Sequence, residues 1–150
     1  MGAVLVGGGL SFAHDFQWIT ARIDVLAEGA KVHRSLGDVG VELLDAAALA
    51  LAKVRTGSFA FGVGPGWRFG AGLMHGTATS ARATGESVAG FFSGPFGAAT
   101  ASIVWRSLSI DLELDAGYAT SGVRGLADTD SAVSLDGGFV GGSLALGFVF

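Results

Sequence analysis

The sequence predicts an all-β protein, an antiparallel up-and-down β-barrel with seven visible strands in a single domain spanning residues 1–150. Two observations lead to this prediction. Half of the residues are apolar and 15% are charged, yet no apolar stretch makes a good helix. The longest uncharged stretch, residues 87–105, is interrupted by Pro95 and by glycines. Apolar side chains instead recur at every second position, the period of a strand with one apolar face.

The alternation defines six strands directly. They cover residues 4–13, 19–28, 59–73, 98–105, 108–118 and 140–150. A seventh segment, residues 39–54, alternates only in part, and residues 42–53 are strong helix formers. We expect a strand there as well, because the neighbouring segments are strands that need a partner between them.

The connections between these strands alternate in length. Short ones are expected near residues 14–17, 55–58 and 105–107, and longer ones at residues 29–38, about 76–96 and 119–138. The face opposite the large apolar side chains is built from small residues such as Gly62, Gly64 and Gly66. A face exposed to water usually carries Lys and Glu, so the small face is expected to point into a crowded lumen and the apolar face toward lipid. The prediction is therefore a transmembrane barrel.

Aromatic residues are expected at the two membrane interfaces. Trp18, Trp105 and Phe148 belong to the end with short turns, and Trp67 and Tyr118 lie about ten residues along their strands. Asp45 shares its parity with Leu43 and Ala47, which are expected to face lipid, and we place it at the outer interface, where a charge costs about 0–1 kcal/mol.

The end of the chain resembles the C-terminal signal of bacterial outer-membrane β-barrel proteins. Apolar residues occupy alternate positions before a final phenylalanine: Leu144, Leu146, Phe148 and Phe150. By size the chain is similar to the small, eight-stranded members of that class. The resemblance implies the bacterial outer membrane as location, contact with outer-membrane lipid, and recognition of the last strand by the barrel assembly machinery.

The resemblance also implies periplasmic N- and C-termini and an even number of strands, so we expect eight strands in the complete protein, one of them upstream. The alternative is that residues 4–13 are the apolar part of a signal peptide, with residues 11–13 as a cleavage site, which leaves six strands.

Charged residues of inward parity form the candidate site. They are Arg22, Asp24, Arg68, Asp111, Glu113 and Asp115. We expect them to form a salt-bridge network inside the barrel, with Arg22 at the depth of Asp111 and Glu113. A cation or substrate site is the functional alternative.

The expected function is that of a non-enzymatic structural, anchoring or surface-exposed membrane protein with a lumen plugged by side chains. Nine basic against thirteen acidic residues argue against nucleic acid as a partner, and the absence of cysteine excludes thiol chemistry. No cofactor or metal is expected, because His14, His33 and His75 lack metal-ligand spacing. Alternatives are a small cation-preferring pore, a lipid-modifying enzyme using His75, Ser80 and Glu86, and a soluble lipid-binding calyx. The oligomeric state is left open.

Overall fold

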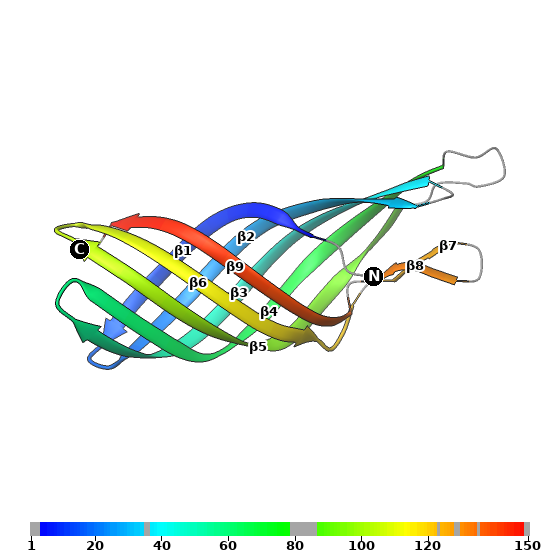
Figure 1. The fold of residues 1–150 in the computed structure, drawn as a ribbon. Coiled ribbons are helices and arrows are strands. Elements are labelled where there is room, and N and C mark those ends of the chain that lie inside the picture. Colours follow the sequence, from blue (N-terminus) through cyan, green and yellow to red (C-terminus); the bar gives the residue numbers. More distant parts are fainter. Residues whose placement is uncertain are drawn as a thin grey trace.

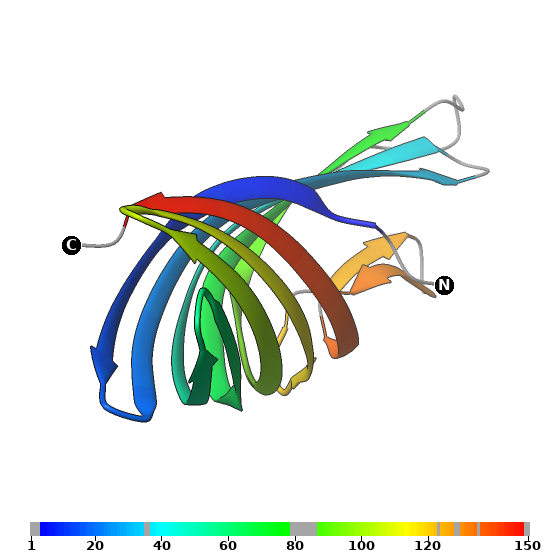
Figure 2. The same ribbon diagram turned by 60° about the vertical axis from the view of Figure 1, so that its left-hand side comes forward.

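Seven strands form one antiparallel sheet that curls into a half-barrel (Figures 1 and 2). The computed structural model describes residues 4–34, 37–78, 87–122, 124–127, 130–134 and 136–148. In sheet order the strands are β1 (Val6–Phe16), β2 (Ile19–Arg34), β3 (Gly37–Thr56), β4 (Phe59–Ala78), β5 (Ser87–Trp105), β6 (Leu108–Ala119) and β9 (Gly137–Phe148). A separate hairpin joins β7 (Arg124–Ala127) and β8 (Asp130–Ser134). The described residues contain no helix, and hence none that could cross a membrane.

The predicted all-β, antiparallel, up-and-down fold is confirmed. Each strand from β1 to β5 pairs with the next along the chain, and β9 completes the sheet beside β6. The ambiguous segment at residues 39–54 is part of β3. The short connections are two-residue turns at 17–18, 57–58 and 106–107. Gln17, Gly57 and Arg106 adopt positive φ there, as tight hairpin turns require.

Two of the expected long connections are largely strand. β2 and β3 continue to Arg34 and Gly37, so most of residues 29–38 belongs to the ladder, and β5 begins at Ser87 rather than near residue 96. The expected loop at residues 119–138 contains the β7–β8 hairpin. Gly, Ser and Pro favoured loops in these stretches, but the neighbouring strands supply hydrogen-bond partners that override the local signals.

Both prolines lie where a ladder is interrupted or ends. Pro65 of β4 lies opposite Ala50 and Leu51 of β3, where the pairing between β3 and β4 is interrupted. Pro95 of β5 pairs with Trp67 on one side, whereas pairing with β6 on the other side starts only at Phe96. Since proline has no N–H to donate, these are the positions that a sheet tolerates.

The apolar and small faces lie as the alternation predicts on most strands. Large apolar side chains cover the outer face of the curl and are about half exposed or more, among them Phe12, Ile23, Phe61, Trp67, Ile103, Leu112, Leu114 and Leu146. The inner face holds buried small or polar residues, among them Thr20, Asp24, Ala60, Ala98, Ser109, Glu113 and Asp115.

The face assignment of β3 was wrong. Leu43, Asp45 and Ala47 are buried on the inner face, and Leu44 is 60% exposed on the outer face. Asp45 is therefore not an outward residue at the membrane interface. Residues 42–53 are apolar at both parities, so the sequence did not mark the inner face, which is set by the register that pairs Ala47 with Asp24 and Arg68.

The polarity of the sheet inverts along β2–β5. We call the part beyond about ten residues from the short turns the extension; it comprises residues 29–34, 37–44, 70–78 and 87–94 and projects past β1 and β9 (Figure 1). Its inner face is an apolar cluster of Val41, Leu43, Met74 and Phe92, against which Leu5 packs. At its start the outer face still exposes Leu44 and Phe91, and beyond them it carries polar groups, namely Lys31, His33, Asp38, Glu42, His75 and Ser87. Nearer the turns the outer face is apolar, and the inner face carries the charged residues beside a second apolar cluster that includes Leu49 and Leu51.

Gly64 is expected to be intolerant of any side chain. A Cβ at this position would lie 1.9 Å from the carbonyl oxygen of Ala50, on the interrupted stretch of β3. We expect Gly64→Ala to lower the free energy of unfolding by about 1–3 kcal/mol, because the backbone of β3 must move away. The measurement is the urea midpoint of unfolding in detergent micelles.

Gly97→Ala is the matched control. Gly97 lies on the adjacent strand and has nothing within 4 Å of a Cβ built on it. Its expected effect is within about 0.5 kcal/mol. Equal losses in the two variants would show that the close approach at Gly64 does not constrain the fold.

Candidate functional site: the charged inner face

Arg22 of β2 holds the first half of an inner charge network. Its Nε and Nη2 atoms donate to Oδ2 of Asp24 at 3.0 and 2.8 Å. Nη2 also forms an ion pair with Oε2 of Glu113, which lies on β6 at the other side of the curl. All three side chains are at most 15% exposed. The structure thus brings Arg22, Asp24 and Glu113 together.

Arg68 of β4 holds the second half. Its Nη2 donates to Oδ2 of Asp115 at 3.2 Å, and its Nε lies 3.5 Å from Oδ1 of Asp45. Asp45 has a fully buried side chain. It belongs to this network, although its sequence position suggested the lipid face. The register that pairs Ala47 with Arg68 places Asp45 on the same face as that guanidinium, and the sequence alone carries no signal for this register.

The network contains more carboxylates than cations. Asp111 points to the same face and accepts a hydrogen bond from Oγ of Ser109 at 2.8 Å. Four carboxylates (Asp24, Asp45, Glu113 and Asp115) thus pair with two guanidinium groups, and Asp111 adds a fifth carboxylate to the same face. Oδ1 of Asp24 is buried without a hydrogen-bond partner among the described residues. The buried charge is only partly compensated, which is costly in a site of low dielectric constant.

Aromatic and aliphatic side chains fill the space around Arg68. Its guanidinium lies 5.4 Å from the ring centre of Phe96 and 5.1 Å from that of Phe139, distances typical of cation–π contacts. Phe96 belongs to an apolar cluster with Ala47, Leu49, Leu51 and Ala98, against which Phe139 packs. Phe96 ends the stretch expected to be a loop, and its inward position is a finding of the structure. Large side chains therefore occupy the middle of the curl.

The predicted interface aromatics are all on the outer face or in a turn. Trp18, Trp67, Trp105, Tyr118 and Phe148 are each at least half exposed. The register puts Trp67 beside Pro95, and it aligns Phe96 with Gly117, so Trp67 and Tyr118 belong to one row across the sheet. Phe148 pairs with Leu108, which pairs with Trp105 near the turns. Along β5 the two rows are about ten residues apart, close to the length of a membrane-crossing strand.

The C-terminal residues singled out by sequence lie along an edge strand. Leu144, Leu146 and Phe148 project from the outer face of β9 and are 74%, 82% and 73% exposed. Phe150 lies outside the described residues.

The histidines do not form a catalytic or metal-binding group in the described part of the chain. Nδ1 of His75 lies 2.8 Å from Oγ of Ser87, at the exposed end of the extension. Ser80 and Glu86, named with His75 as a candidate hydrolase set, lie outside the described residues. His14 makes an edge contact with Phe16, and His33 bonds to Asp38. Within the described residues no three His, Asp or Glu side chains are arranged to hold a metal ion.

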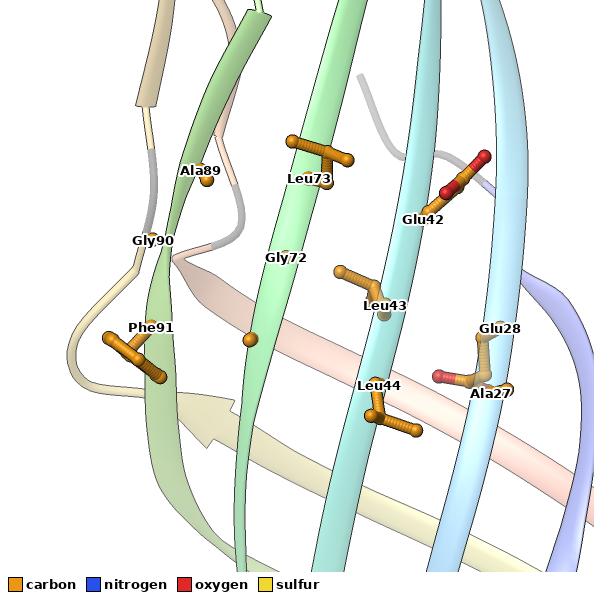
Figure 3. Close-up of a pocket in the computed structure, with 11 residues that line it drawn as sticks. Ala27, Glu28, Glu42, Leu43, Leu44, Gly72, Leu73, Ala89, Gly90 and Phe91 are labelled. Carbon is orange, nitrogen blue, oxygen red and sulfur yellow. The ribbon is translucent and has the colours of Figure 1, made fainter.

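A shallow hollow crosses β2–β5 near the start of the extension (Figure 3). Small residues of three strands, Ala27, Ala71 and Ala89, form it between the larger side chains of Leu44, Leu73 and Phe91. Glu28 and Glu42 are its charged lining residues. The lining includes no hydroxyl, imidazole or basic side chain, so the hollow offers apolar contact rather than acid–base chemistry.

An exposed charge cluster lies at the β2–β3 end of the extension. We expect the stability of this end to depend on pH. The Oδ2 atom of Asp38 lies 3.0 Å from Nζ of Lys31, and its Oδ1 atom lies 2.7 Å from Nδ1 of His33. These hydrogen bonds hold the pKa of the Asp38 carboxyl below its ordinary value. Because the folded pKa is the lower one, the contact stabilises this end fully above the unfolded pKa of about 3.9, and the contribution is lost as pH falls through the folded pKa.

The measurement is the titration of the Asp38 side-chain carbonyl by NMR. In Lys31→Met, which removes the first contact and keeps the aliphatic stem, we expect the pKa of Asp38 to move up toward its ordinary value. An unchanged titration curve would show that Lys31 does not hold the carboxylate.

Comparisons with protein-family models, with curated proteins and with solved structures find no match to this chain.

Proposed function

We propose that the chain is an integral β-barrel protein of a bacterial outer membrane, with a structural, anchoring or surface-exposed role, no enzymatic activity and a plugged interior. The observation that carries the proposal is the inversion of polarity along β2–β5. An apolar outer face with a charged inner face suits a wall between lipid and a polar interior. A polar outer face with an apolar inner face, as in the extension, suits water.

The dimensions of the outer apolar band support the same proposal. The band begins at the short turns, carries Trp18 and Trp105 there, and reaches the row of Trp67 and Tyr118 about ten residues further. Aromatic side chains at both borders are typical of membrane interfaces. The location in the bacterial outer membrane is inferred from the resemblance of the last strand to the assembly signal of bacterial outer-membrane β-barrel proteins.

The band is testable by cysteine labelling, since the chain has no cysteine of its own. In lipid vesicles, we expect Leu112→Cys on the outer face of β6 to be protected from a water-soluble maleimide, and His75→Cys in the extension to react. After unfolding in urea, both positions should react. Equal labelling of both cysteines in the folded state, or a folded chain that stays soluble without detergent, would overturn the proposal in favour of a soluble calyx.

The filling of the interior argues for a plug over a pore. Phe96, Phe139 and the paired Arg68 occupy the inner space, and an eight-stranded barrel is just wide enough for side chains. We therefore expect no steady conductance in a planar bilayer. Steady, cation-selective steps would instead support a pore lined by the inner carboxylates.

A further inference from the structure

The short-turn end of the sheet carries more basic than acidic side chains, a feature that the proposed function does not use. We define the turn border as residues 14–20, 53–60 and 103–109, at the left end of the sheet in Figure 1. Its aspartate, lysine and arginine residues are Asp15, Lys53, Arg55 and Arg106. Asp15 accepts a hydrogen bond from Nζ of Lys53 at 2.7 Å. Arg55 and Arg106 are exposed and have no ion-pair partner among the described residues.

Backbone hydrogen bonds hold the three short turns in one row. The amide of Lys53 donates to the carbonyl oxygen of Trp18 at 2.7 Å, and the amide of Val104 donates to that of Ser58 at 2.8 Å. These bonds join the β1–β2 turn to β3 and the β3–β4 turn to β5. The basic side chains of the turn border therefore belong to one continuous surface at the end of the outer apolar band.

Arg106 is held beside an aromatic side chain of this band. Its guanidinium lies 5.5 Å from the ring centre of Trp105, which is 68% exposed. Arg106 has a φ of 56° at the first position of its two-residue turn. This conformation favours glycine, and Gly57 adopts it at the first position of the neighbouring β3–β4 turn. Turn geometry therefore does not explain why the position holds an arginine.

We propose that the turn border is a binding surface for the anionic headgroups of membrane lipids, with Arg55 and Arg106 as its phosphate-binding residues. The proposal rests on the membrane location proposed above. A tryptophan at a membrane interface lies at the level of the headgroups, so the contact with Trp105 keeps the Arg106 guanidinium at that level. Guanidinium groups bind phosphate oxygens through paired, charge-assisted hydrogen bonds. Basic residues near an anionic lipid surface are also attracted to it as a whole.

The other border of the apolar band lacks this surplus of positive charge. Lys31 of the extension lies 3.0 Å from a carboxylate oxygen of Asp38 and is paired with it. Glu28 and Glu42, which line the hollow at this end, have no ion-pair partner within the described part of the chain. We therefore expect the preference for anionic lipid at the turn border alone, and this asymmetry distinguishes the proposal from a general affinity for charged membranes.

Quenching of single tryptophans by brominated lipids tests the proposal at each border. One variant keeps Trp105 (Trp18→Phe with Trp67→Phe), and the other keeps Trp67 (Trp18→Phe with Trp105→Phe). Both are refolded into vesicles of phosphatidylcholine and phosphatidylglycerol. At Trp105 we expect brominated phosphatidylglycerol to be preferred about fivefold or more in low salt, and high salt should reduce this preference. At Trp67 the two brominated lipids should quench equally.

Arg106→Gln should remove most of the preference at Trp105, and adding Arg55→Gln should remove the rest. Glutamine fits the turn position of Arg106, since Gln17 occupies the first position of the β1–β2 turn with a φ of 45°. Lys31→Gln is the matched control, because it removes one positive charge from the extension. It should leave the preference at Trp105 unchanged.

Equal quenching of Trp105 by the two brominated lipids, or an undiminished preference in Arg106→Gln, would overturn the inference and leave the membrane proposal intact. Absence of quenching by either lipid at both tryptophans would contradict the membrane proposal as well. Inorganic phosphate and sodium chloride at equal ionic strength should reduce the preference equally. A stronger effect of phosphate would assign the turn border to a free phosphate ion and would exclude the lipid headgroup as its ligand.

Discussion

Leu112→Arg is expected to block stable insertion into lipid vesicles. Leu112 lies on the outer face of β6, 49% exposed, between Trp105 near the turns and the row of Tyr118. At the middle of a bilayer an arginine on the lipid face costs about 2–4 kcal/mol. The measurement is the fraction of chain that is folded in vesicles across a urea series. The variant should lose its folded fraction at a much lower urea concentration than the unmodified chain.

Ala145→Ser is the matched control for this substitution. Ala145 is on β9, opposite Asp111, on the inner face. A hydroxyl there meets a polar surface, so insertion should match that of the unmodified chain. Equal tolerance of the two substitutions would mean that the outer face of the sheet does not meet lipid.

Arg22→Ala is expected to be the most destabilising change in the inner network. It leaves Asp24 and Glu113 as neighbouring buried carboxylates without their shared cation. The expected loss is on the order of 3 kcal/mol, the range measured when one partner of a buried ion pair is removed. It would be read from the unfolding midpoint in detergent micelles.

Combining Arg22→Ala with Glu113→Gln should restore part of that stability, because one of the stranded charges is removed. The double variant is therefore expected to unfold at a higher midpoint than Arg22→Ala alone. Additive losses in the double-mutant cycle would show that the two side chains do not interact. Such a result would favour a hydrated, cation-attracting interior.

The positions of the strands and turns were readable from sequence because they depend on local chemistry. Alternation at period two identifies β1, β2, β4, β6 and β9, and the two-residue turns follow from where the alternation breaks. The inward parity of Arg22 and Glu113, and their similar distance from the short-turn end, were also enough to predict the contact between them. Each of these strands has one apolar face and one small or polar face. This difference alone determines which face of the strand points outward.

Only the tertiary structure decided the features that depend on neighbouring strands. β3 is apolar at both parities, so its register with β2 and β4 determined that Asp45 points inward to Arg68. Residues 87–96 read as a loop, yet pairing with β4 makes them strand and brings Phe96 into the interior. The inversion of polarity in the extension and the two open edges likewise follow from which strands lie side by side, because hydrogen-bond partners and facing side chains come from distant parts of the chain.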